Sequence, residues 1–366
     1  MKRISMVFGA CALAGVIAVG GVLAAGGAAG DPVISLNYLT GTFLPQLLGQ
    51  TGDKVEAGLE EAYLDALEDL GSSGIAPSGP EERRVKEGDR LTLASGGVLI
   101  PLAGQLQLAS GVAVDVTAGT EVLAPAPLAK QHRYIVTEQG SAVFTAASDT
   151  AVLAAGGTVS LEPSAAPDYN RMADALKSLD LFRGSNLSIG SGYELEEVPT
   201  RIQGLIMFLR LIGEEQAALD STASHPFRDV PDWCDRYVAY AYQQGYTNGV
   251  DLPAGLFGPG DVMTSAQYMT LLLRALGYTD SGSAPEFNWA VSAAFGQNLG
   301  LLTEGEYQRL TTGTFYRAQV AYISYYALSY PLKGQSATLL DRLVERGTVT
   351  RDAAQNALGM VSTLRL

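Results

Sequence analysis

The feature that most constrains this chain is a segment that occurs three times in its second half. The copies read TRIQGLIMFLRLIG from Thr200, TSAQYMTLLLRALG from Thr264 and YRAQVAYISYYALS from Tyr316. Their glutamines are separated by 267 − 203 = 64 and 319 − 267 = 52 residues. Each copy has apolar residues at helical spacing, and a second helix-like run precedes it. A period of this size predicts three helix-loop-helix units that bury their apolar faces against one another.

The starts and ends of these helices carry local signals. Thr200-x-x-Gln203 and the corresponding pair that begins at Thr264 are capping boxes, which satisfy the first N–H groups of a helix. In the middle unit, Trp233 opens the upstream helix, and Gly245 and Gly249 supply permissive backbone where that helix ends. Trp289 opens the upstream helix of the third unit. We expect both tryptophans to anchor the core.

The N-terminus has the pattern of a secretory signal peptide over residues 1–29, with Lys2 and Arg3 before an apolar stretch and small residues after it. A retained membrane anchor is the alternative. Removal of the signal would leave Cys234 as the single cysteine, so an intramolecular disulfide is excluded from the mature chain. The formal charge of −14 disfavours nucleic acid and anionic lipid as partners.

Composition divides the remainder of the chain. Residues 30–82 read as an extended segment, an acidic amphipathic helix and a Gly/Ser/Pro-rich linker. Residues 85–162 contain short alternating runs such as RLTLA, VAVDV and AVFTAAS, which predict a compact antiparallel sandwich or barrel. A second linker is expected before Tyr169, and residues 169–366 are predicted to be helical. The expected fold class is therefore multi-domain α+β, with a small antiparallel β-domain before an all-α region.

The sequence contains no recognisable catalytic or metal-binding motif. His132 and His225 are its only histidines, and neither belongs to a nucleophile, base or metal pattern. We expect His132 to be a half-buried structural residue. Gly-x-Ser-x-Gly and paired-cysteine motifs are missing, and GSNLSIGSG lacks the lysine of a phosphate loop. We expect no enzyme, cofactor or metal, although the abundant acids leave a glycosidase-type carboxylate pair open.

The middle unit resembles the S-layer homology family, by which exported bacterial proteins attach to cell-wall polymer. That family's unit runs Phe-x-Asp-Val, Trp, a helix, Gly-x-x-x-Gly, Phe-x-Pro, and a Thr-Arg-Ala-Glu helix start that ends near Arg-x-Leu-Gly. The matching residues, in order, are Phe227, Asp229, Val230, Trp233, Gly245, Gly249, Phe257, Pro259, Arg274, Leu276 and Gly277. The resemblance covers three repeats at about 169–215, 225–279 and 286–332.

The resemblance implies a pseudo-threefold bundle whose grooves bind pyruvylated secondary cell-wall polysaccharide, with the arginine after the threonine as a principal contact. Arg201 and Arg317 match that arginine, whereas Ser265 replaces it in the middle copy. An arginine at a helix N-terminus is also suited to an anion on physical grounds. The candidate glycan-binding residues are Arg201, Arg317, Thr200, Trp233 and Trp289. The expected location is the cell wall or surface of a Gram-positive-type envelope.

Two further functions stay open at this point. The protein could be a structural surface-layer component whose β-domain assembles with itself or with other envelope proteins. It could also be a glycan-acting enzyme that the repeats anchor to the wall. Turnover of wall glycan by the purified protein would favour the enzyme, and ordered assembly without turnover would favour the structural component.

Overall fold

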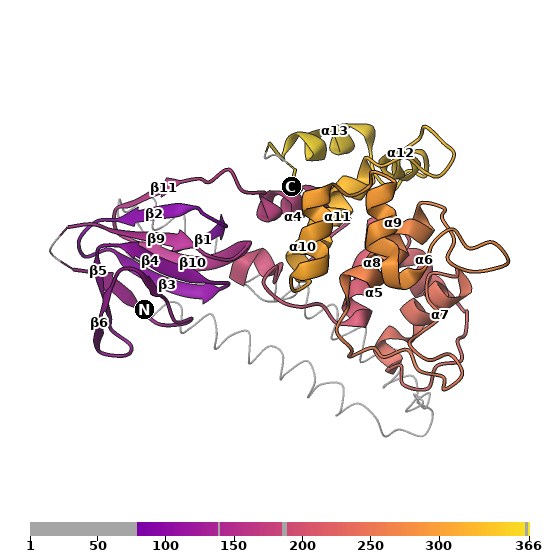
Figure 1. The fold of residues 1–366 in the computed structure, drawn as a ribbon, viewed down its shortest axis with the longest axis horizontal. Helices are drawn as coiled ribbons and strands as arrows, with labels where there is room; N and C mark the ends of the chain where they lie inside the picture. The colour runs from indigo at the N-terminus through magenta and orange to yellow at the C-terminus, as the bar shows by residue number, and fades with distance from the viewer. Residues whose placement is uncertain (1–78, 138–139, 185–188, 363–364) are drawn as a thin grey trace, which may run out of the picture. The chain divides into compact units, whose positions relative to one another are not determined.

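The structure is a computed structural model that describes residues 79–137, 140–184, 189–362 and 365–366 (Figure 1). Gly79–Leu366 form one compact unit. The expected signal peptide, the acidic helix and most of the first linker lie outside the described residues. Among the described residues, no helix has the length and apolar character needed to cross a membrane.

The first part of the described chain is a pair of antiparallel sheets that share an apolar core. One sheet has the strand order β1-β10-β3-β8-β5-β6 and the other β11-β2-β9-β4-β7. The strands are β1 (Glu81–Lys86), β2 (Arg90–Leu93), β3 (Val98–Ala103), β4 (Leu106–Ser110), β5 (Val112–Asp115), β6 (Thr120–Leu123), β7 (Ala126–Pro127), β8 (Tyr134–Val136), β9 (Ala142–Ala146), β10 (Thr150–Gly156) and β11 (Val159–Glu162). The antiparallel β prediction is confirmed, although β1 begins inside the segment that was expected to be a linker.

Strand alternation explains the core between these sheets. In β9, Ala142, Phe144 and Ala146 are buried, whereas the two residues between them are half-buried. Phe144 pairs with Leu91 on one side and Leu108 on the other, and all three side chains are fully buried. A period of two therefore places one face of each strand on the shared core.

From Tyr169 onward, the secondary structure in the described chain is almost entirely helical. The helices are α4 (Tyr169–Ser178), η2 (Ile189–Gly192), α5 (Arg201–Leu211), α6 (Glu215–Asp220), η3 (Asp232–Cys234), α7 (Asp235–Gln243), α8 (Ser265–Ala275), η4 (Trp289–Val291), α9 (Ser292–Asn298), α10 (Glu304–Thr312), α11 (Arg317–Leu328), α12 (Leu339–Glu345) and α13 (Arg351–Gly359). Nearly every residue of α11 is buried, and the helix lies between α4 and α8 in Figure 1. Tyr268 of α8 and Ser324 of α11 share a buried hydrogen bond of 2.8 Å, which joins the two helices inside the helical region.

The predicted helix starts and ends are confirmed. Thr200 and Thr264 both cap their helices with a reciprocal capping box. Gly245 and Gly249 have φ angles of +74° and +72°, in the left-handed region that glycine tolerates. At Gly249 a Cβ would lie 2.4 Å from the Leu256 carbonyl oxygen, so the turn requires glycine there.

The segment between β11 and α4 is held by hydrogen bonds. Lys86 Nζ donates to the carbonyl oxygen of Ser164 at 2.6 Å, and the Ser164 backbone N–H donates to Asp89 at 2.8 Å. Arg84 of β1 forms a bidentate ion pair with Asp174 of α4, with both distances 2.9 Å. The second predicted linker is therefore held against the strands.

Candidate functional site

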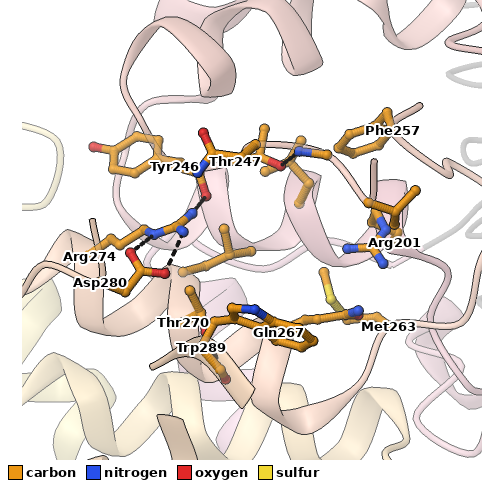
Figure 2. Close-up of a pocket in the computed structure, with 15 residues that line it drawn as sticks. Arg201, Tyr246, Thr247, Phe257, Met263, Gln267, Thr270, Arg274, Asp280 and Trp289 are labelled. Atoms are coloured by element: carbon orange, nitrogen blue, oxygen red, sulfur yellow. Dashed lines mark hydrogen bonds and ion pairs between the residues drawn. The ribbon is translucent and has the colours of Figure 1, made fainter. Parts of the chain in front are cut away.

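The helical region contains an open pocket of about 440 Å³ (Figure 2). Its walls come from the start of α5, the loop that follows α7, the helix α8 and the start of η4. The lining residues are Arg201, Leu205, Tyr246, Thr247, Asn248, Gly249, Val250, Phe257, Met263, Gln267, Thr270, Leu271, Arg274, Asp280 and Trp289. Ligand sites of small molecules have volumes of about 300–1,000 Å³, so the pocket has the size of such a site.

Arg201 lies at one side of this pocket, at the start of α5. It is the first residue of α5, and its backbone N–H donates to the Asp261 carbonyl oxygen at 2.7 Å. Its Nε is buried and has no hydrogen-bond partner in the described part of the chain. Burial lowers the pKa of the guanidinium, and the nearby Asp261 opposes that shift. Arginine stays charged in proteins, so this side chain is a half-buried cation in the pocket wall.

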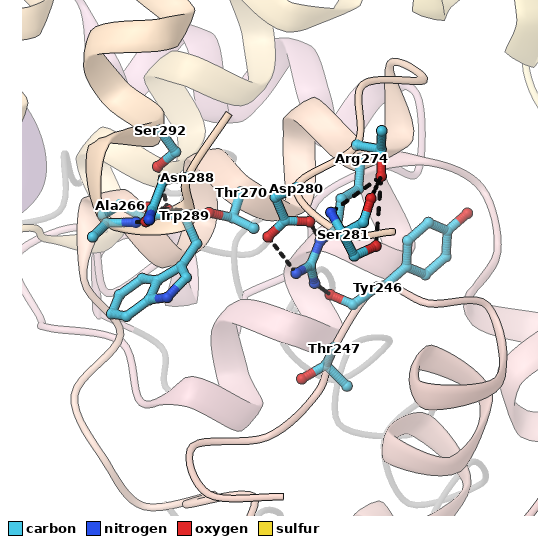
Figure 3. A network of polar contacts seen from close by, with 12 residues as sticks. Tyr246, Thr247, Ala266, Thr270, Arg274, Asp280, Ser281, Asn288, Trp289 and Ser292 are labelled. Carbon is cyan, nitrogen blue, oxygen red and sulfur yellow. Dashed lines mark hydrogen bonds and ion pairs between the residues drawn. The ribbon is translucent and has the colours of Figure 1, made fainter. Parts of the chain in front are cut away.

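The other charged residues of the pocket neutralise each other. Arg274 donates to both carboxylate oxygens of Asp280, through Nε at 2.8 Å and Nη2 at 2.7 Å. Its Nη1 also donates to the Tyr246 carbonyl oxygen at 2.5 Å, so this network fixes the loop after α7 (Figure 3). Of the three charged residues that line the pocket, Arg201 is therefore the one without an ion-pair partner within 4.0 Å among the described residues.

The two tryptophans are not core anchors, so that expectation was wrong. Trp289 is 53% exposed and Trp233 is 63% exposed. Trp289 lies in η4, which has no buried residue, and Trp233 lies in η3, where Cys234 is the buried residue. Most of the buried residues belong to the helix that follows each turn. Trp289 lines the pocket, and its carbonyl oxygen accepts a hydrogen bond from Thr270 Oγ1 at 3.5 Å. It is thus an accessible aromatic surface at the site.

Arg317, the second arginine that matches the family's glycan contact, is buried. It is only 6% exposed, and its Nε donates to the Tyr193 carbonyl oxygen at 3.0 Å. Its Nη1 lies 3.9 Å from a carboxylate oxygen of Glu194. The structure therefore separates the two matched arginines, because Arg201 faces the pocket and Arg317 is used to hold α11 against the segment that follows η2.

Three other residues named in the sequence analysis make local structural contacts. Thr200 is the N-cap of α5 and does not line the pocket. Ser265, which replaces the arginine in the middle copy, donates through Oγ to the Leu310 carbonyl oxygen at 2.7 Å. His132 is half-buried and its Nδ1 lies 2.7 Å from Asp115, in agreement with the structural role expected for it.

Sequence reasoning missed several residues of this pocket. Arg274 and Gly249 were noted only as parts of the repeat pattern, and Asp280 and Gln267 were not considered as site residues. The spacing of Arg274 and Asp280 gave no signal, because their pairing depends on a turn after α8. The described residues contain no cluster of three or more metal-ligating side chains. No protein-family model matches the chain, and no curated protein is significantly similar to it.

Proposed function

We propose that this protein is an exported surface protein whose helical region binds an acidic cell-wall polysaccharide without a covalent bond. The glycan's acid group would lie on Arg201, in the pocket between α5 and α8. The observation that carries this proposal is that Arg201, a half-buried cation without an ion-pair partner among the described residues, lines the same pocket as the accessible Trp289. In a chain with a formal charge of −14, a cation without an ion-pair partner in a pocket is a selective attractant for an anion.

The contacts between repeat copies support a ring of three units. The Arg201 N–H donates to the Asp261 carbonyl oxygen at 2.7 Å, and the Arg317 N–H donates to that of Glu197 at 2.8 Å. The two acceptors are 261 − 197 = 64 residues apart, which is the interval between the first two copies of the repeat. The contact between the first and second copies is therefore equivalent to the contact between the third and first copies. The hydrogen bond from Ser265 to Leu310 joins the second copy to the third. These contacts are those expected of a pseudo-threefold bundle, and they support the proposed kinship with S-layer homology repeats.

The pocket's chemistry suits one acidic sugar unit. A guanidinium presents a planar fork of donors that matches a carboxylate, such as that of a pyruvate ketal. The indole of Trp289 offers an apolar face for a sugar ring, and Thr247 and Thr270 add polar edges. We further propose that this is the competent groove, because the arginine of the third copy already donates to a backbone carbonyl.

Co-sedimentation with isolated wall sacculi tests the proposal. Arg201→Ala should weaken binding about tenfold or more, because a hydrogen bond to a charged group contributes about 1.5–3 kcal/mol and 1.4 kcal/mol is a factor of ten. Arg351→Ala is the matched control, since Arg351 is an exposed arginine at the first position of the capped helix α13. The control variant should sediment as the wild type does.

Removal of the glycan's acidic groups provides a second arm. Mild acid treatment of the sacculi should lower wild-type binding to the level of Arg201→Ala, and raised salt should weaken binding as well. Undiminished sedimentation of Arg201→Ala with untreated sacculi would remove the pocket from the function. A structural surface-layer role without glycan binding would then be the better explanation.

A further inference from the structure

The capping glutamine of α8 has one end that the fold does not use. Gln267 Oε1 accepts the Thr264 N–H at 3.0 Å, which completes the capping box. Its Nε2 carries two further N–H groups and has no acceptor within the described residues. Gln267 is half-buried, and Figure 2 shows it beside Trp289 in the pocket wall. The two N–H groups of Gln267 Nε2 therefore belong to a residue that lines the same pocket as Arg201.

The corresponding glutamine of α11 shows what such a donor can hold. Gln319 Oε1 accepts the Tyr316 N–H at 2.7 Å, as its counterpart in α8 does for Thr264. Its Nε2 donates to the carboxylate of Asp149, a buried residue between β9 and β10. Arg309 of α10 donates to the other oxygen of the same carboxylate. An amide and a guanidinium thus bind one carboxylate at the first turn of α11.

We propose that Gln267 Nε2 is a second ligand donor in the pocket and that it holds the glycan's acid group together with Arg201. This inference rests on the proposed function and extends it to a residue that the repeat motif marks only as a helix cap. The Asp149 carboxylate is an internal model for the glycan's acid group. It accepts from Nε2 of the capping glutamine of α11, as we propose the acid group accepts from Nε2 of Gln267. A neutral amide adds a donor without adding charge, so the two residues match a single carboxylate.

The substitution Gln267→Glu separates the two ends of this side chain. A glutamate can cap as well as a glutamine, since Glu306 in the same slot of α10 accepts the Thr303 N–H at 2.8 Å. The variant therefore keeps the cap but replaces the pocket's donor with a negative charge. We expect binding to untreated sacculi to fall at least tenfold, with an unchanged thermal unfolding midpoint. After acid removal of the glycan's acidic groups, the variant and the wild type should bind equally weakly.

Gln203→Glu is the matched control. Gln203 occupies the same capping slot in α5, but it is exposed and does not line the pocket, so its variant should bind as the wild type does. Wild-type affinity of Gln267→Glu, together with lost affinity of Arg201→Ala, would overturn this inference and leave the proposed function in place. Wild-type affinity of both variants would overturn the proposed function and this inference with it.

Discussion

Replacement of Arg317 by methionine tests whether that arginine is a structural residue. Methionine keeps the length of the aliphatic stem, so little cavity is created, but the hydrogen bond from Nε to the Tyr193 carbonyl oxygen is lost. Burial lowers the pKa of Arg317, so methionine also relieves the cost of burying a charge. That relief does not offset the loss, because the buried carbonyl oxygen is left without a donor, at a cost of about 1–3 kcal/mol.

The matched variant is Arg201→Met. Its Nε has no partner in the described chain, so its removal leaves no acceptor unsatisfied. We therefore expect urea unfolding, followed by helical circular dichroism at pH 7, to give Arg317→Met a free energy of unfolding about 1–3 kcal/mol below that of the wild type. Arg201→Met should lie within about 0.5 kcal/mol of the wild type. Equal stability of the two variants, or a less stable Arg201→Met, would refute this division of roles.

Three further predictions follow from exposure, charge and linker contacts. Trp289→Ala should weaken sacculus binding about two- to tenfold, because a stacking surface for the sugar is lost. Trp233→Ala should change the free energy of unfolding by less than about 1 kcal/mol. A large loss of stability in either variant would show that the tryptophan is a core residue after all. Burial alone would raise the pKa of Asp229, but the backbone N–H groups of Phe257 and Gly258 hold it below its usual 3.8. The stability that this carboxylate contributes is therefore present above its unfolded pKa and is lost as pH falls through its folded pKa. Between about pH 5 and pH 2, Asp229→Asn should lose less stability than the wild type does. Identical pH profiles of the two proteins would contradict this. Asp89→Ala should speed limited proteolysis between β11 and α4, because Asp89 binds that segment, and equal cleavage rates would show that the contact does not protect it.

The sequence predicted the local features of this protein well because those features depend on near neighbours. The capping boxes at Thr200 and Thr264 join residues three positions apart, and the helix-ending glycines act through their own backbone angles. Strand alternation likewise records which face of each strand is buried, so the antiparallel β-region could be predicted without a structure. The proposed repeat and its glycan remain predictions at both levels.

The roles of matched residues depended on distant parts of the chain. Arg201 and Arg317 share a motif, but the segment after η2 supplies an acceptor for Arg317, and no described residue supplies one to Arg201 Nε. The exposure of both tryptophans, which sequence reasoning placed in the core, follows from the direction in which a single 3-10 turn projects them. Local sequence therefore set where each helix begins. Only the tertiary structure decided which charges are paired, because a pairing partner more than a hundred residues away leaves no local pattern.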